Sequence, residues 1–98
     1  MNNEQHAALG RELHDALMQR RTLEPLSSRH PDITVDDAYA IQQCMLEHRL
    51  RAGERVIGKK IGVTSKAVMN MLGVFQPDFG WLTAGMLYNE GEAVPMDR

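Results

Sequence analysis

The spacing of apolar side chains changes near residue 55, and this change constrains the fold of the chain more than any other feature. Residues 34–52 carry apolar side chains at helical spacing, as at Ile41 and Met45, which is typical of an amphipathic helix. Residues 56–61 instead mix β-branched and polar side chains in a strand-like alternation. The sequence therefore predicts an α+β fold in which helices come first and strands follow.

Two helices are expected in the first half of the chain. Within residues 3–20, Leu9 and Leu13 belong to an apolar series at helical spacing. Gly10 interrupts this series and is expected to weaken the helix by about 1 kcal/mol relative to alanine. Residues 21–33 contain prolines and serines, and they are predicted to form a connector.

The second helix has clear signals at both ends. Thr34 can cap its N-terminus, and Asp36 and Asp37 follow in the first turn, where the helix dipole favours negative charge. Gly53 comes directly after the last turn, in a position that glycine often occupies. These signals predict a helix that begins after Thr34 and ends before Gly53.

A lysine on the predicted strand has glycine neighbours on its own face. Side chains alternate between the faces of a strand, so Lys60 shares one face with Gly58 and Gly62. Asp78 follows in a turn-like segment at 76–80. Glycine in a strand often marks the close approach of a ligand, so the two charged residues can form an acid/base or anion-binding pair. The alternative is a surface lysine on an edge strand and an ordinary turn aspartate.

The rest of the second half is predicted to contain short elements. Thr64 or Ser65 can cap a helix that Gly73 ends. The expected order is a helix at 66–72, a loop at 75–82, a short strand at 86–88, a turn at 89–91 and an extended segment at 93–95.

Composition argues against several classes of protein. The chain has 11 basic and 13 acidic residues, which argues against nucleic-acid binding through phosphate contacts. No apolar run reaches the roughly 18 residues that would suggest a membrane span, and the N-terminus lacks the features of a signal peptide. Cys44 is the only cysteine, so no intrachain disulfide can form, and it is expected to be a small buried hydrophobe. These features favour a cytoplasmic protein.

Metal motifs are absent from the sequence. His6 and His14 lie two helical turns apart, too far to share an ion directly, and no zinc-binding pattern occurs. Glu90 and Glu92 could hold Mg²⁺ as alternate carboxylates, but a solvent-facing turn is the favoured interpretation.

Three segments together resemble a known family. They are residues 56–65 (VIGKKIGVTS), 72–74 (LGV) and 76–80 (QPDFG). They resemble the N-terminal part of the 2-oxopent-4-enoate (2-keto-4-pentenoate) hydratases of the fumarylacetoacetate hydrolase superfamily, and residues 37–42 (DAYAIQ) resemble a helix of that family. The related 4-oxalocrotonate decarboxylases share the Gly-x-Lys-x-Gly-x-Thr-Ser pattern but usually lack the segment at 76–80, which favours the hydratases.

The resemblance implies a reaction and a set of site residues. These hydratases add water to 2-hydroxypenta-2,4-dienoate to give 4-hydroxy-2-oxopentanoate in the meta-cleavage degradation of aromatic compounds. The resemblance implies that Lys60 lies in the active site, where it favours enolate charge or relays a proton, and that Asp78 is the acid/base. Thr64 and Phe79 are implied to line the substrate site.

The resemblance also implies a domain organisation, a cofactor and partners. A helical lobe at 1–54 would precede the first strands of a mixed β domain at 55–98. A divalent ion, Mg²⁺ or Mn²⁺, polarises the substrate in the complete enzyme, but its carboxylate ligands lie beyond the equivalent of this C-terminus. The chain is therefore expected to be a truncated segment, inactive alone. A homo-oligomer is expected, and a pathway decarboxylase or aldolase is a conceivable partner.

Two alternatives stay open. The complete protein could be a 4-oxalocrotonate decarboxylase or another superfamily member, which substrate profiling would reveal. Alternatively the chain is a non-catalytic helical interaction module that binds a partner through apolar faces at Leu9 and Leu13 and at Ile41 and Met45. Such a module would be a folded monomer without metal dependence.

Overall fold

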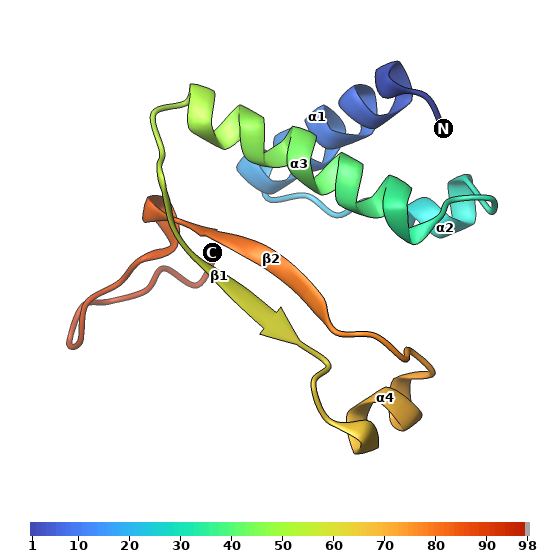
Figure 1. Ribbon diagram of the computed structural model, residues 1–98. Coiled ribbons are helices and arrows are strands. Elements are labelled where there is room, and N and C mark those ends of the chain that lie inside the picture. Colours follow the sequence, from blue (N-terminus) through green and yellow to red (C-terminus); the bar gives the residue numbers. More distant parts are fainter. Residues whose placement is uncertain (98) are drawn as a thin grey trace. The chain divides into compact units, whose positions relative to one another are not determined.

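The computed structural model describes residues 1–97, which form two compact units. One unit contains residues 1–53 and the segment that begins at Tyr88, and the other contains residues 54–87. The elements, in chain order, are α1 (Asn3–Gln19), α2 (Leu26–Arg29), α3 (Val35–Arg51), β1 (Val56–Gly62), α4 (Lys66–Leu72), β2 (Asp78–Thr83) and a 3-10 helix, η1 (Ala84–Met86) (Figure 1). Helices together with an antiparallel strand pair confirm the α+β prediction at this level.

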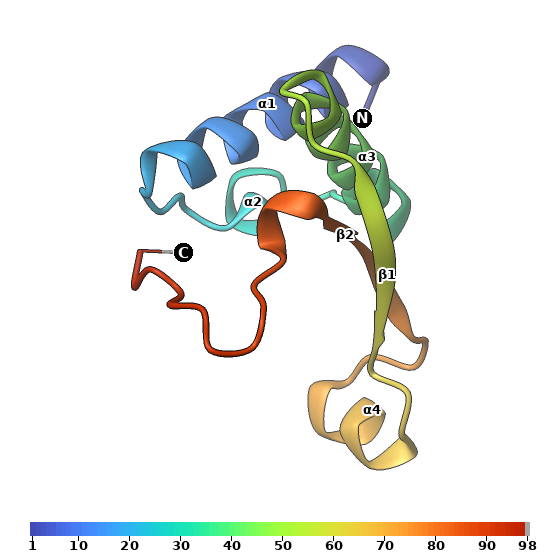
Figure 2. The ribbon, with the colours of Figure 1, turned by 90° about the vertical axis from the view of Figure 1, so that its left-hand side faces the viewer.

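The helical unit is built on the packing of α1 against α3 (Figure 2). Its buried apolar side chains are Leu9, Ala16, Ile41 and Leu46. Gly10 lies at the helix contact, where an added Cβ would come within 2.6 Å of the Cys44 Cβ. Gly10 therefore allows close helix packing, which offsets the helix-propensity cost expected from the sequence. None of the helices in residues 1–97 is long and apolar enough to cross a membrane.

Local capping sets the helix ends. The Thr34 hydroxyl accepts a hydrogen bond from the N–H of Asp37, as predicted, and α3 ends just before Gly53. The Ser65 side chain caps α4 by accepting from the N–H of Val68, and Gly73 ends that helix with a φ of 70°. These four boundaries follow directly from the sequence signals.

The second unit contains a two-stranded antiparallel sheet formed by β1 and β2. Lys60 pairs with Gly80 and Gly62 pairs with Asp78. The pairing shifts by one residue at Ile57, so β1 has a bulge near its start. Past the bulge, the register decides which side chains of the two strands share a face.

Three sequence expectations about the elements are wrong. The predicted loop at 75–82 instead contains most of β2, because Pro77 and Gly80 gave turn signals inside a segment that pairs with a distant strand. The predicted strand at 86–88 overlaps η1 and has no strand pairing in the described residues, because a short apolar run does not specify strand structure without a partner. The connector at 21–33 contains a short helix, α2, which was not predicted because prolines and serines favour a loop.

Candidate functional site

The β1–β2 register brings together the two residues singled out by the sequence. Because Gly62 pairs with Asp78 and Lys60 pairs with Gly80, Lys60 and Asp78 are diagonal neighbours on one face of the sheet. The Lys60 Nζ lies 3.7 Å from the Asp78 Oδ2, and about half of each side chain is exposed. An ion pair this exposed adds roughly 0–1 kcal/mol to stability, so its geometry matters more for chemistry than for folding.

Glycines make room for this pair. A Cβ added to Gly62 would lie 2.7 Å from the Asp78 Oδ1 and 3.9 Å from the Lys60 Nζ. The Asp78 carboxylate therefore rests against the bare backbone of Gly62. Gly80, the strand partner of Lys60, is buried. The positions next to Lys60 on its own face, at 62 and across the strand at 80, therefore carry no side chain.

The two oxygens of the Asp78 carboxylate have different surroundings. Oδ2 faces the ammonium group of Lys60, whereas Oδ1 is buried and has no hydrogen-bond partner among the described residues. Buried carboxylate oxygens normally find a donor, and exceptions call for an explanation. An acceptor without a donor, beside the Lys60 ammonium group, is suited to taking up or handing on a proton.

The other face of the sheet carries a different set of side chains. The Lys59 Nζ lies 4.4 Å from the centre of the Trp81 ring, a cation–π contact. Ile61 pairs with Phe79, so Phe79 shares the face of Lys59 and not that of Lys60. Thr64 is exposed and follows Val63, whose φ of 54° is unusual for a β-branched residue. The structure therefore joins Lys60 with Asp78 but does not place Phe79 beside them.

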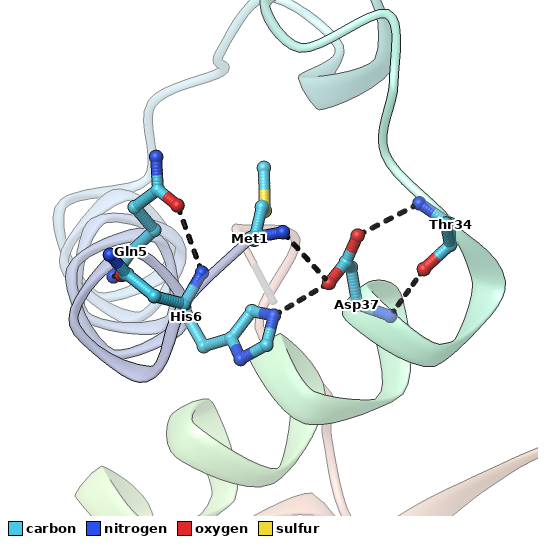
Figure 3. A network of polar contacts seen from close by, with 6 residues as sticks. Met1, Gln5, His6, Thr34 and Asp37 are labelled. Carbon is cyan, nitrogen blue, oxygen red and sulfur yellow. Dashed lines mark hydrogen bonds and ion pairs between the residues drawn. The ribbon is translucent and has the colours of Figure 1, made fainter.

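A second polar cluster, around Asp37, was not anticipated as a cluster (Figure 3). His6 Nε2 donates to Asp37 Oδ1 at 2.8 Å, and the Thr34 N–H donates to Oδ2 at 3.0 Å. The amino group of Met1 lies 3.7 Å from Oδ1. The bond from His6, followed by the bond from the Thr34 N–H, holds the pKa of Asp37 well below its usual range. This cluster joins the start of α1 to the start of α3 within the helical unit.

The described residues do not provide a metal site. No group of three or more His, Cys, Asp or Glu side chains in residues 1–97 could hold an ion. Glu90 and Glu92 are exposed, and the Glu92 N–H donates to the carbonyl of Asn89 at 3.0 Å, which closes the predicted turn. Their donor set does not fit a divalent ion, so no chemical step is assigned to a metal held by these residues.

The chain was compared with known proteins by sequence and by structure. No protein-family profile matches the chain. A 2-hydroxypent-2,4-dienoate hydratase from Pseudomonas putida is 68% identical over 90 residues, or 92% of this chain. A 2-hydroxyhexa-2,4-dienoate hydratase from Comamonas testosteroni is 58% identical over 87 residues. This chain is a homologue of the dienoate hydratases. It spans 40% of the first relative and 33% of the second.

A solved structure supports the same relationship for this hydratase homologue. The 4-oxalocrotonate decarboxylase from Pseudomonas putida G7, complexed with magnesium and adipate, superposes with a TM-score of 0.79 at 29% identity. The match covers 85% of this chain and 32% of the decarboxylase chain. The same decarboxylase is also known in complex with calcium and acetate. The resemblance to the 2-keto-4-pentenoate hydratases, noted from residues 56–65, 72–74 and 76–80, is therefore confirmed.

Proposed function

We propose that this chain supplies Lys60 and Asp78 as the acid/base pair of a hydratase that converts 2-hydroxypenta-2,4-dienoate to 4-hydroxy-2-oxopentanoate. The observation that carries the proposal is the 3.7 Å approach of the two side chains over a glycine backbone, in a chain 68% identical to a dienoate hydratase. The chain covers 40% of that relative, so we assign the activity to a longer protein, in which this chain would be joined to a fumarylacetoacetate-hydrolase-like β domain.

The reaction needs protons moved at defined atoms. Loss of the proton on the 2-hydroxyl, with protonation at C5, turns the dienol into a conjugated 2-oxo acid. Water then adds its oxygen at C4 and a proton at C3, so that one water enters and nothing is oxidised or reduced. The Lys60 ammonium can hold the negative charge that develops on the C2 oxygen. The unpartnered Oδ1 of Asp78 can accept or return a proton.

The residues around the pair have secondary roles in this proposal. Thr64, just past the end of β1, is proposed to contact the substrate. Phe79 lies on the opposite face, where it pairs with Ile61, so its role is to support the sheet beneath the site. A divalent ion, as in the magnesium-bound decarboxylase, would be held by residues outside those described here.

A chimeric enzyme tests the proposal. This chain would replace the 90 aligned residues of the Pseudomonas putida hydratase. Hydration of 2-hydroxypenta-2,4-dienoate would then be measured as the decrease in the absorbance of the dienol. Lys60→Ala and Asp78→Asn are each expected to lower turnover by at least about 100-fold. Lys59→Ala is the matched control because Lys59 lies on the opposite face, over Trp81. Unchanged turnover in both site variants would refute the assignment.

Two competing functions make different predictions. A decarboxylase would release CO₂ from 4-oxalocrotonate, so the complete protein should be assayed with both substrates. A non-catalytic interaction module could use an apolar groove of about 410 Å³ in the helical unit, lined by Leu13, Ile41 and Met45 among others. Two residues of its expected binding faces, Leu9 and Ile41, are instead buried in the core of this unit. Such a module predicts that substitutions at Lys60 and Asp78 have no effect on the biological role of the chain.

A further inference from the structure

A carboxylate closes the open end of the β1–β2 sheet. The Glu54 Oε1 accepts a hydrogen bond from the Thr83 hydroxyl at 2.8 Å and another from the Gly85 N–H at 2.9 Å. The Ala84 N–H donates to the carbonyl of Arg55 at 2.9 Å. Residues just before β1 are thereby tied to the end of β2 and the turn that follows it.

This contact is built into the packing. Thr83 is fully buried, so its hydroxyl needs a partner within the protein. A Cβ on Gly85 would collide with the Oε1 of Glu54, so glycine is required for this approach. Thr83 and Gly85 are therefore both suited to contact with this carboxylate.

The other end of the sheet is not a tight hairpin. A two-residue hairpin turn fixes strand register by its geometry, but β1 and β2 are joined by residues 63–77, which include α4. A two-stranded sheet is also only marginally stable by itself. Contacts at the open end can therefore contribute to the observed register, beside the cross-strand contacts Lys60–Asp78 and Lys59–Trp81.

Register matters here because two lysines are adjacent. A slip of one residue moves every side chain of a strand to the opposite face. Such a slip would put Lys59, instead of Lys60, on the face of Asp78. The bulge at Ile57 lies between Glu54 and the site. The register at the site therefore depends on the contact at Glu54 and on the one extra residue that the bulge adds to β1.

We propose that Glu54 is a positioning residue, which holds the sheet paired in the register that keeps Asp78 beside Lys60. Its catalytic meaning rests on the proposed function, but the register can be measured without any activity. Glu54 touches neither reacting group, and its effect passes through Thr83 and Gly85 to β2.

Disulfide trapping in the 98-residue chain measures the register. Cys44→Ala removes the native thiol, and Ile61→Cys is combined in turn with Asp78→Cys, Phe79→Cys or Gly80→Cys. The first and last pairs report slips of one residue in either direction, and the Phe79 pair reports the observed register. Cα partners in a sheet lie within disulfide range, so mild oxidation should favour the Phe79 pair.

Glu54→Ala is expected to lower the rate advantage of the Phe79 pair at least about fivefold. Glu54→Gln should keep the advantage, because its amide oxygen can still accept both hydrogen bonds. Glu47→Ala, at an exposed glutamate of α3, is the control and should change nothing. Far-UV circular dichroism should show that the helices persist in Glu54→Ala.

A second variant keeps the test decisive if Glu54→Ala does not fold. Thr83→Val keeps the shape of the side chain and removes one of the two bonds, so it should lower the same rate advantage by a smaller factor. Unchanged selectivity in Glu54→Ala, or in Thr83→Val where Glu54→Ala is insoluble, would overturn the proposal. A different result would overturn only the proposed function: Glu54→Ala loses the preference for the Phe79 pair, but the Lys60 and Asp78 variants keep normal turnover.

Discussion

The Asp78 carboxylate lies against the backbone of Gly62, with Oδ1 2.7 Å from the point that a Cβ on Gly62 would occupy. This relationship links a strand glycine to the position of the candidate acid/base. It explains physically why the face of Lys60 carries glycine at 62, since any larger residue there would move the carboxylate. Gly58 lies on the same face, but a Cβ added there would make only an ordinary van der Waals contact with the Leu82 side chain, at 3.7 Å.

Gly62→Ala should therefore displace Asp78 and lower turnover of the chimeric hydratase at least about tenfold, because small misplacements of catalytic groups are costly. Gly58→Ala is the matched control and should keep turnover within about threefold, since its added methyl group has room. Steady-state assays of both variants check this prediction. Equal turnover in the two variants would contradict it.

Gly10→Ala should destabilise the helical unit although alanine is the better helix former. The added methyl group would overlap the Cys44 Cβ, and overpacking of this kind costs roughly 1–3 kcal/mol, which equals or exceeds the gain of about 1 kcal/mol in helix propensity. Urea unfolding followed by far-UV circular dichroism measures the change. Ala8→Gly, at an exposed position of α1, is the control that measures the effect of helix propensity alone. If Gly10→Ala is more stable than the parent, the helices can move apart without a cost in stability.

Asp37 should make the stability of the chain depend on acid. Its pKa is lower in the folded state than in the unfolded chain, mainly because of the bond from His6. The stabilisation is therefore present above the unfolded pKa of about 3.9 and is lost as the pH falls toward the folded value. Asp37→Asn should be less stable than the parent at neutral pH, and the difference should shrink between about pH 5 and about pH 2.5.

Urea unfolding at several pH values tests this expectation. Asp36→Asn is the control, because Asp36 is the exposed neighbour in the same helical turn. A difference between the parent and Asp37→Asn that stays constant with pH would show that the charge of Asp37 does not contribute. His6→Ala should reproduce part of the effect, since it removes the donor that lowers the pKa most.

Much of this structure follows from local signals in the sequence. The ends of α3 and α4 depend on single caps, Thr34 and Ser65, whose side chains bond within their own first turn. The meeting of Lys60 with Asp78 was also foreseen as a pair, because alternation along one strand isolates Lys60 between glycines. Features of this kind need no knowledge of distant contacts.

The remaining features depend on contacts between distant parts of the chain. Glu54 and Thr83 are 29 residues apart, and nothing in either local segment predicts that they meet. The same is true of His6 and Asp37, 31 residues apart, although the Thr34 and Asp37 spacing did indicate a cap. Strand β2 was missed for this reason too, and with it the face of Phe79, which only the register with Ile61 reveals.

The long connection between β1 and β2 has a consequence for how such a protein can diverge. Residues 63–77 leave β1 after Gly62 and return to β2 at Asp78 without fixing how the strands pair. Insertions, deletions and exchanges in this segment can therefore accumulate over evolution while Lys60 and Asp78, the proposed acid/base pair, keep their places. New substrate preferences would arise most readily through changes in this segment, while Lys60 and Asp78 keep their positions.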